Sequence, residues 1–183
     1  HVTGVDRSPF LLEKAREKSD SEGVQVEWIL RDMRDFIRTN AYDLALSLFT
    51  SFGYFDNKDD DCKVLRNVFQ SLKSGGQLVI DIVGKEWLAK VFQPTTSEKT
   101  PDGALLVQRH EIFDDWTRIR NEWILIRNEQ AKAFHFHHTI YSGQELKELL
   151  LDAGFADVRI CGDLNGREYG TAAERLVAVA RKS

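Results

Sequence analysis

The sequence predicts an α/β fold: a Rossmann-like, mainly parallel sheet with helices on both faces, an antiparallel last strand and an inserted antiparallel β meander. Three observations predict it. Strand-like and helical segments alternate over residues 2–83, as in parallel sheets with right-handed crossovers. Three strand-like runs joined by short polar turns then fill residues 104–141, which is typical of a meander. An amphipathic helix and two strands follow.

The stretch Val2–Pro9 is interpreted as a short buried strand that ends in Asp6 and turns at once into a helix over residues 9–19. Ser8 can cap this helix, and Pro9 suits its first turn. An acid at the carboxyl end of such a strand lies at the ligand-binding edge of the sheet, where it can bind the hydroxyl groups of a ribose. In dinucleotide-binding folds this acid follows the second strand, about 20 residues after a glycine-rich loop. That loop and its strand are absent here, so we expect an N-terminally incomplete domain.

Two further strands are predicted to end at the same edge. Residues 24–30 alternate between apolar and polar side chains and lead to Asp32, whereas residues 42–49 are mostly apolar, as in a central strand. An aromatic loop over residues 50–55 follows. A helix with a clear apolar stripe then leads to a buried strand over residues 77–83.

The pattern changes after residue 83. A short helix is predicted near residues 85–91, and residues 93–103, which hold two prolines, are interpreted as a loop. The meander strands are predicted at residues 104–113, 118–127 and 131–141. Ser142 and Glu145 have capping-box spacing and begin the next helix. The last two strands are expected at residues 158–161 and 175–180.

Length and composition predict one soluble domain, residues 1–183, with residues 104–141 as an insert over the active site. The net charge of −4 gives no reason to expect a nucleic-acid partner. No apolar run has transmembrane length and no signal peptide is visible, so no membrane partner is expected. Two cysteines make no disulfide framework, which favours a cytoplasmic location. A homodimer is left open.

The order of these elements and several local motifs resemble those of class I S-adenosylmethionine-dependent methyltransferases, in the branch that acts on small molecules. The matching motifs are Gly4-Val5-Asp6-Arg7-Ser8-Pro9, Asp32-Met33, Tyr42-Asp43-Leu44-Ala45, Leu72-Lys73-Ser74-Gly75-Gly76-Gln77-Leu78, and Glu145-Leu146 with Ala153-Gly154-Phe155. The resemblance covers essentially the whole chain. It implies S-adenosylmethionine as cofactor and transfer of its methyl group to a nitrogen or oxygen atom of a small molecule.

The resemblance also implies roles for individual residues. Asp6 would bind the ribose hydroxyls, and Asp32 would bind the adenine amino group. Six residues are assigned to the cofactor in this way: Asp6, Arg7, Asp32, Met33, Phe49 and Thr50. In the family, the strand that is missing here lies between the second and fourth strands. Its absence would leave two unpaired edges in the sheet, so we expect either a truncated sequence or an assembly in which another segment fills the gap.

Methyl transfer makes modest chemical demands on the protein. It is an in-line displacement at a carbon activated by a sulfonium, so alignment and exclusion of water are the main tasks. A general base is needed only when the nucleophile must lose a proton. The candidates for that role are Tyr54, His137 and Tyr141. The candidates for substrate binding are Phe52, Tyr54, Arg109, Tyr141 and Tyr169. For the aromatic residues, core packing is an equally good or better interpretation.

The charged and histidine side chains of the meander allow several interpretations. His135 and His137 share one strand face, but no third metal ligand is evident, so we predict no metal site. They can instead form a pocket wall, supply a base, or lie on a solvated face. Arg109 can bind a substrate carboxylate or pair with an acid such as Glu111 or Glu122 across strands.

Two other functions remain open at this stage. A nicotinamide-dependent Rossmann oxidoreductase also uses an acid after its second strand, although the two final strands after an amphipathic helix fit a methyltransferase better. A non-catalytic assembly module or inactive fragment is the other alternative.

Overall fold

The structure, a computed structural model, describes residues 1–183. Its strands are β1 (Thr3–Asp6), β2 (Glu27–Leu30), β3 (Tyr42–Ser47), β4 (Leu72–Ile82), β5 (Thr95–Lys99), β6 (Leu105–Phe113), β7 (Arg118–Arg127), β8 (Gln130–Thr139), β9 (Asp157–Cys161) and β10 (Leu176–Arg181). Its helices are α1 (Pro9–Ser21), α2 (Lys58–Ser71), α3 (Lys85–Val91) and α4 (Gly143–Asp152), with a 3-10 turn η1 (Met33–Asp35). The predicted α/β class is confirmed.

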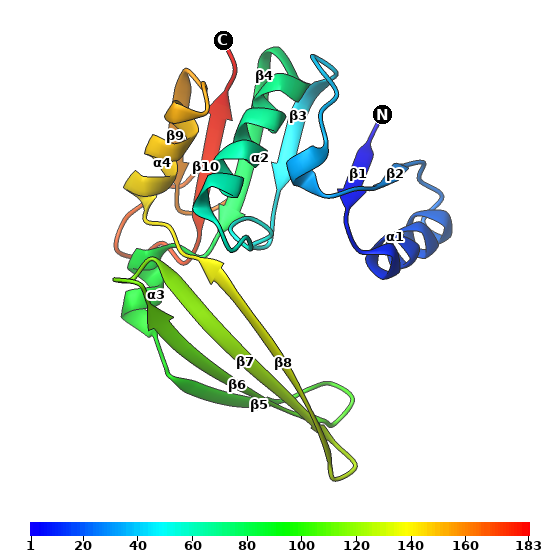
Figure 1. Cartoon of the computed structure of the whole chain (residues 1–183), viewed down its shortest axis with the longest axis vertical. Helices are drawn as coiled ribbons and strands as arrows, with labels where there is room; N and C mark the ends of the chain where they lie inside the picture. The colour runs from blue at the N-terminus through cyan, green and yellow to red at the C-terminus, as the bar shows by residue number, and fades with distance from the viewer.

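The strands of the Rossmann-like part form two sheets. Strand β1 pairs in parallel with β2, and the second sheet has the order β3-β4-β10-β9. Strands β3 and β4 are parallel, while β10 runs antiparallel to both of its neighbours, as predicted for the last strand. Strand β1 does not pair with β3, so a break divides the predicted parallel sheet at this point (Figure 1).

The β1–β2 unit is held to the rest of the molecule through η1 and α2. The side-chain amide of Asn67 on α2 donates to the carbonyl oxygens of Met33 (3.3 Å) and Arg34 (2.8 Å). The Arg34 guanidinium also forms an ion pair with Asp60 at 3.0 Å. These contacts fix the segment after β2, and with it the β1–β2 unit, relative to α2.

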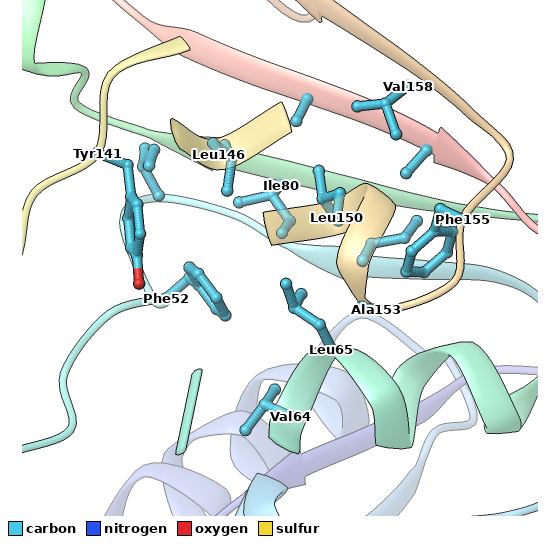
Figure 2. Packing of buried hydrophobic residues seen from close by; sticks show 14 of the residues in the cluster. Phe52, Val64, Leu65, Ile80, Tyr141, Leu146, Leu150, Ala153, Phe155 and Val158 are labelled. Carbon is cyan, nitrogen blue, oxygen red and sulfur yellow. The ribbon is translucent and has the colours of Figure 1, made fainter. Parts of the chain in front are cut away.

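The main core lies between α2, α4 and one face of the β3-β4-β10-β9 sheet (Figure 2). Leu65 of α2, Leu146 and Leu150 of α4, and Ile80 of β4 are at most 1% exposed. Burying each such side chain contributes about 1.5–3 kcal/mol. The predicted capping box at Ser142 is confirmed and fixes the start of α4.

The opposite face of the same sheet is more open. Leu46, Val79 and Val177 line a cavity of about 280 Å³ on this face, together with residues 163–166. Leu46 is 58% exposed. This cavity includes none of the residues predicted to bind cofactor or substrate.

The meander leaves the carboxyl edge of the sheet as a four-stranded antiparallel sheet of order β5-β6-β7-β8 (Figure 1). Three of these strands were predicted. The expectation of a loop over residues 93–103 is wrong, because β5 lies inside this segment. The two prolines suggested a loop, but Pro94 and Pro101 flank β5 and withhold no backbone donor from its pairing with β6.

Element ends differ from the predictions by a few residues, and β2 begins only at Glu27. None of the helices combines the length and the apolar character that a membrane-spanning segment needs.

Candidate functional site

Parallel pairing brings the carboxyl ends of β1 and β2 to one edge, because Asp6 is in register with Leu30. Asp6 Oδ1 accepts a hydrogen bond from the Ser8 N–H at 2.7 Å, and Ser8 in turn caps α1. This local turn orients the Asp6 carboxylate while its second oxygen accepts no hydrogen bond from a protein group. A carboxylate held in this way can accept a hydrogen bond from a hydroxyl group of a ligand.

Asp32, after β2, is more strongly engaged. The Arg34 side chain donates to both of its oxygens, at 3.0 and 2.8 Å, and the Arg34 backbone N–H donates at 2.9 Å. These hydrogen bonds, together with the positive charge of Arg7, lower the pKa of Asp32 to about 2, which keeps it ionised. The predicted neighbours Arg7, Asp32 and Met33 therefore lie close together, although Asp32 has less free acceptor capacity than Asp6.

Phe49 and Thr50 follow β3 in an uncommon backbone conformation. Their φ angles are +55° and +59°, in the left-handed region that non-glycine residues rarely adopt. The Phe49 N–H donates to Asp81 Oδ2 at 3.0 Å. The Phe49 side chain is 84% exposed, so this apolar ring projects from the carboxyl edge of the sheet without a covering protein group.

The aromatic loop after Thr50 divides its side chains between the core and the meander. Phe52 is 2% exposed and lies beside Tyr141 in the main core (Figure 2). Tyr54 is 42% exposed and packs on β8, with its ring centroid 4.9 Å from that of His138. Of the two aromatic residues predicted to contact substrate here, only Tyr54 is accessible.

The loop is also hydrogen-bonded to the end of β8 through its backbone. The Thr139 N–H donates to the Gly53 carbonyl at 2.8 Å. Gly53 has a φ of +99°, and a Cβ atom there would lie 2.9 Å from the Thr139 carbonyl oxygen. A side chain at this position is therefore excluded by both conformation and space.

One face of the meander, which we call the aromatic face, carries a polar network among aromatic rings. It consists of His110, Asn121, Trp123, Phe136 and His138. The His110 Nδ1 and Asn121 Oδ1 atoms are 2.7 Å apart, and Asn121 Nδ2 lies 3.5 Å from His138 Nδ1. Burial lowers the pKa of His138 to about 4. At neutral pH its imidazole is uncharged and can accept a hydrogen bond.

Sequence reasoning did not select His110, Asn121 or His138 as site residues. Alternation along β8 sets His138 on the same face as Phe136, but the register that sets Asn121 opposite Phe136 and beside His110 is fixed by pairing across three strands. The signal available was alternation alone, which does not give register.

The opposite face of the meander, the charged face, holds Arg109 and His137. Arg109 forms an ion pair with Glu122 at 3.0 Å, as the cross-strand alternative predicted. His137 Nε2 lies 2.6 Å from Asp56 Oδ1. His135 is 4.0 Å from Glu122. These residues do not share the face that contacts Tyr54.

Two tyrosines predicted to bind substrate, Tyr141 and Tyr169, are hydrogen-bonded to acids. The Tyr141 hydroxyl is buried and donates to Asp61 Oδ2 at 2.7 Å. Burial and the Asp61 charge raise the pKa of Tyr141 above its usual range, so it keeps its proton at neutral pH. The Tyr169 hydroxyl donates to Glu86 at 2.6 Å, and burial followed by this bond raises the pKa of Tyr169 as well.

Asp61 itself is fully buried, and its Oδ1 atom has no hydrogen-bond partner. Burial raises the pKa of Asp61 to about 6, against the opposing effects of the Tyr141 hydrogen bond and the nearby Lys58 charge. No group of three or more histidine, cysteine or acidic side chains is arranged to hold a metal ion.

Comparisons with known proteins relate both the sequence and the fold to one enzyme class. A family model described as a methyltransferase domain matches residues 1–76. YqeM of Bacillus subtilis (strain 168), named as a candidate methyltransferase, is 27% identical over 100% of this chain and 75% of its own length.

Solved structures extend the likeness to the whole fold. The CcbJ methyltransferase from Streptomyces caelestis matches with a TM-score of 0.87 and 19% identity, over 100% of this chain and 74% of that one. S-adenosylmethionine-bound CalS10 from Micromonospora echinaspora, an amino pentose methyltransferase, matches with a TM-score of 0.72 and 20% identity, over 100% and 74% of the two chains.

Proposed function

We propose that this chain is a class I S-adenosylmethionine-dependent methyltransferase and that it transfers a methyl group to a nitrogen or oxygen atom of a small molecule. The observation that carries the proposal is the set of side chains at the carboxyl ends of β1 and β3. Asp6 has one oxygen that accepts no protein hydrogen bond, and the ring of Phe49 is 84% exposed. Tyr54, in the loop after Phe49, packs on the aromatic face of the meander.

The residues at this edge fit the cofactor. The free Asp6 oxygen suits a ribose hydroxyl, because a carboxylate accepts such a hydrogen bond strongly. Phe49 offers an aromatic surface, which can lie against an adenine ring or a sulfonium. Bound S-adenosylmethionine would supply a methyl group on a positively charged sulfur that departs as a neutral thioether. We place Arg7, Asp32, Met33 and Thr50 around the same ligand.

On the acceptor side, we propose that Tyr54 and His138 form the wall against which the small molecule lies. The Nδ1 atom of the uncharged His138 imidazole faces the Asn121 amide N–H, so its Nε2–H can donate a hydrogen bond to a polar group of the small molecule and orient it. Tyr54 adds an aromatic surface that excludes water from one side. CalS10, whose likeness covers the meander as well, is an amino pentose methyltransferase, which supports a small polar acceptor.

The charged face contributes less to this proposal. Arg109 and His137 on this face, and Tyr169 in the loop between β9 and β10, lie apart from the wall formed by Tyr54 and His138. We propose that Arg109 and Tyr169 bind substrate, and that His137 acts as a base, for an acceptor that extends beyond this wall. Tyr141 and Phe52 are buried, so we assign them to the support of the loop, and we propose residues 104–141 as an insert over the active site.

The location and the class of partner are inferred from the cysteines and the net charge. Cys62 and Cys161 are free thiols, which favours a reducing compartment such as the cytoplasm. The negative net charge gives no support to a nucleic-acid partner.

Isothermal titration of the 183-residue chain with S-adenosylhomocysteine, the demethylated product, tests the proposal, with NAD titrated in parallel. Binding of the former alone is expected. Replacement of Asp6 by alanine should weaken it about 10–100-fold, because a charge-assisted hydrogen bond is lost. Asp20→Ala, which removes an exposed acid from α1, is the matched control. Binding of NAD alone, or of neither ligand by a folded chain, would refute the proposal.

A further inference from the structure

The loop that carries Phe49 is held in place by a buried carboxylate and an arginine from two distant strand ends. Asp81 lies on β4 and is 3% exposed, while Arg175 directly precedes β10. The Arg175 Nε–H donates to Asp81 Oδ1 at 2.7 Å. The other carboxylate oxygen, Oδ2, accepts the Phe49 N–H. One carboxylate thus joins the arginine to the backbone of the loop.

Both partners also reach Thr50. The Arg175 guanidinium donates to Thr50 Oγ1 at 3.2 Å. The Thr50 N–H donates to the backbone carbonyl of Asp81 at 2.9 Å. Three hydrogen bonds therefore reach Phe49 and Thr50, a fourth joins Arg175 to Asp81, and both Phe49 and Thr50 have positive φ angles.

Such a conformation needs an external cause. A single non-glycine residue is disfavoured in the left-handed region by about tenfold or more in population, and two in succession are rare. Strained residues of this kind persist only where surrounding groups hold them. Here the side chains of Asp81 and Arg175, together with the Asp81 backbone carbonyl, are the groups that do so.

We infer that Asp81 and Arg175 are positioning residues, which hold Phe49 and Thr50 in the left-handed conformation that presents them to the methyl donor. The inference rests on the proposed function for the identity of that ligand. We call the Asp81–Arg175 pair the clamp. If the clamp is weakened, the loop spends less time in the conformation that binds the methyl donor. The apparent dissociation constant for that ligand then rises by the inverse of the fraction of chains in this conformation.

Hydrogen exchange tests the clamp without any ligand. In Arg175→Gln the backbone amides of Phe49 and Thr50 should exchange at least about threefold faster. The Asp81 oxygens that accept their hydrogen bonds are less firmly held when the arginine is lost. Amides of β4 and β10 should keep their rates, which also shows that the variant is folded. Arg120→Gln, which breaks an ion pair with Glu111 on the charged face, is the matched control. Unchanged exchange at Phe49 and Thr50 overturns the inference.

Binding of S-adenosylhomocysteine tests the consequence. Arg175→Gln should raise the dissociation constant about tenfold, and Asp81→Asn should do the same. In a Thr50→Gly background the loss caused by Arg175→Gln should shrink below about threefold, because glycine adopts the left-handed region freely. An equal loss in both backgrounds would mean that the pair only stabilises the fold, and would overturn the inference.

The two proposals fail in different ways. If the unmodified chain binds no S-adenosylhomocysteine, the proposed function fails, while the exchange rates of Phe49 and Thr50 still decide whether Asp81 and Arg175 form the clamp.

Discussion

The buried carboxyl group of Asp61 makes the stability of this protein depend on pH in a direction that can be worked out. Its pKa in the folded chain is about 6, against an ordinary value of 3.8, chiefly because of burial. The folded chain therefore holds this proton more tightly than the unfolded chain does. The resulting stability is fully present below about pH 3.8 and is lost as the pH rises through about 6.

The magnitude follows from the same two values. A difference of about 2 pH units corresponds to about 3 kcal/mol, since each unit is worth about 1.4 kcal/mol. Asp61→Asn removes the titrating carboxyl group while keeping an oxygen that can accept the hydrogen bond from the Tyr141 hydroxyl. The free energy of unfolding of the natural chain, minus that of the variant, should thus fall by about 3 kcal/mol from acid to neutral pH.

Urea unfolding at several pH values between about 3.5 and 8 measures this difference directly. Other titrating groups are common to both chains and cancel in the subtraction. Asp59→Asn makes the same chemical change at an exposed position of α2 and serves as the control. A difference between the natural chain and Asp61→Asn that does not change with pH would refute the account of this buried acid.

Three further substitutions test separate parts of the structure. Gly53→Ala should destabilise the chain by about 1–3 kcal/mol in urea unfolding, because its Cβ meets the Thr139 carbonyl in a left-handed conformation; a loss below about 0.5 kcal/mol would contradict the loop geometry. Tyr54→Leu should lower kcat/KM for the methyl acceptor about tenfold or more and leave S-adenosylhomocysteine binding unchanged in titration, since this ring packs on His138; equal losses in both would place it at the cofactor instead. Ser142→Ala should cost about 1 kcal/mol of unfolding free energy through loss of the capping box of α4, and no loss would mean that this cap contributes nothing.

Local signals in the sequence predicted most of the regular structure. Ser8 before Pro9 and Ser142 before Glu145 mark helix starts through hydrogen bonds within one turn, so neighbouring residues suffice to find them. The strand β5 was missed because flanking prolines masked a short polar segment, whose pairing with β6 is visible only in three dimensions.

The candidate site was only partly predictable for the same reason. Asp6 ends a strand and could be selected from its position alone. The Asn121–His138 network and the Asp81–Arg175 pair depend on contacts between residues 17 and 94 positions apart. Alternation along a strand assigns a face, but register and long-range pairing decide which side chains meet.

Mapping S-adenosylhomocysteine binding onto the backbone amides of the isotopically labelled chain would test the central claim most directly, with NAD examined in parallel. The account predicts shifts that grow with the S-adenosylhomocysteine concentration at residues 6–8, 32–34 and 49–54, on the carboxyl edge of both sheets. Shifts confined to the cavity lined by Val79 and Val177, or seen with NAD alone, would contradict it.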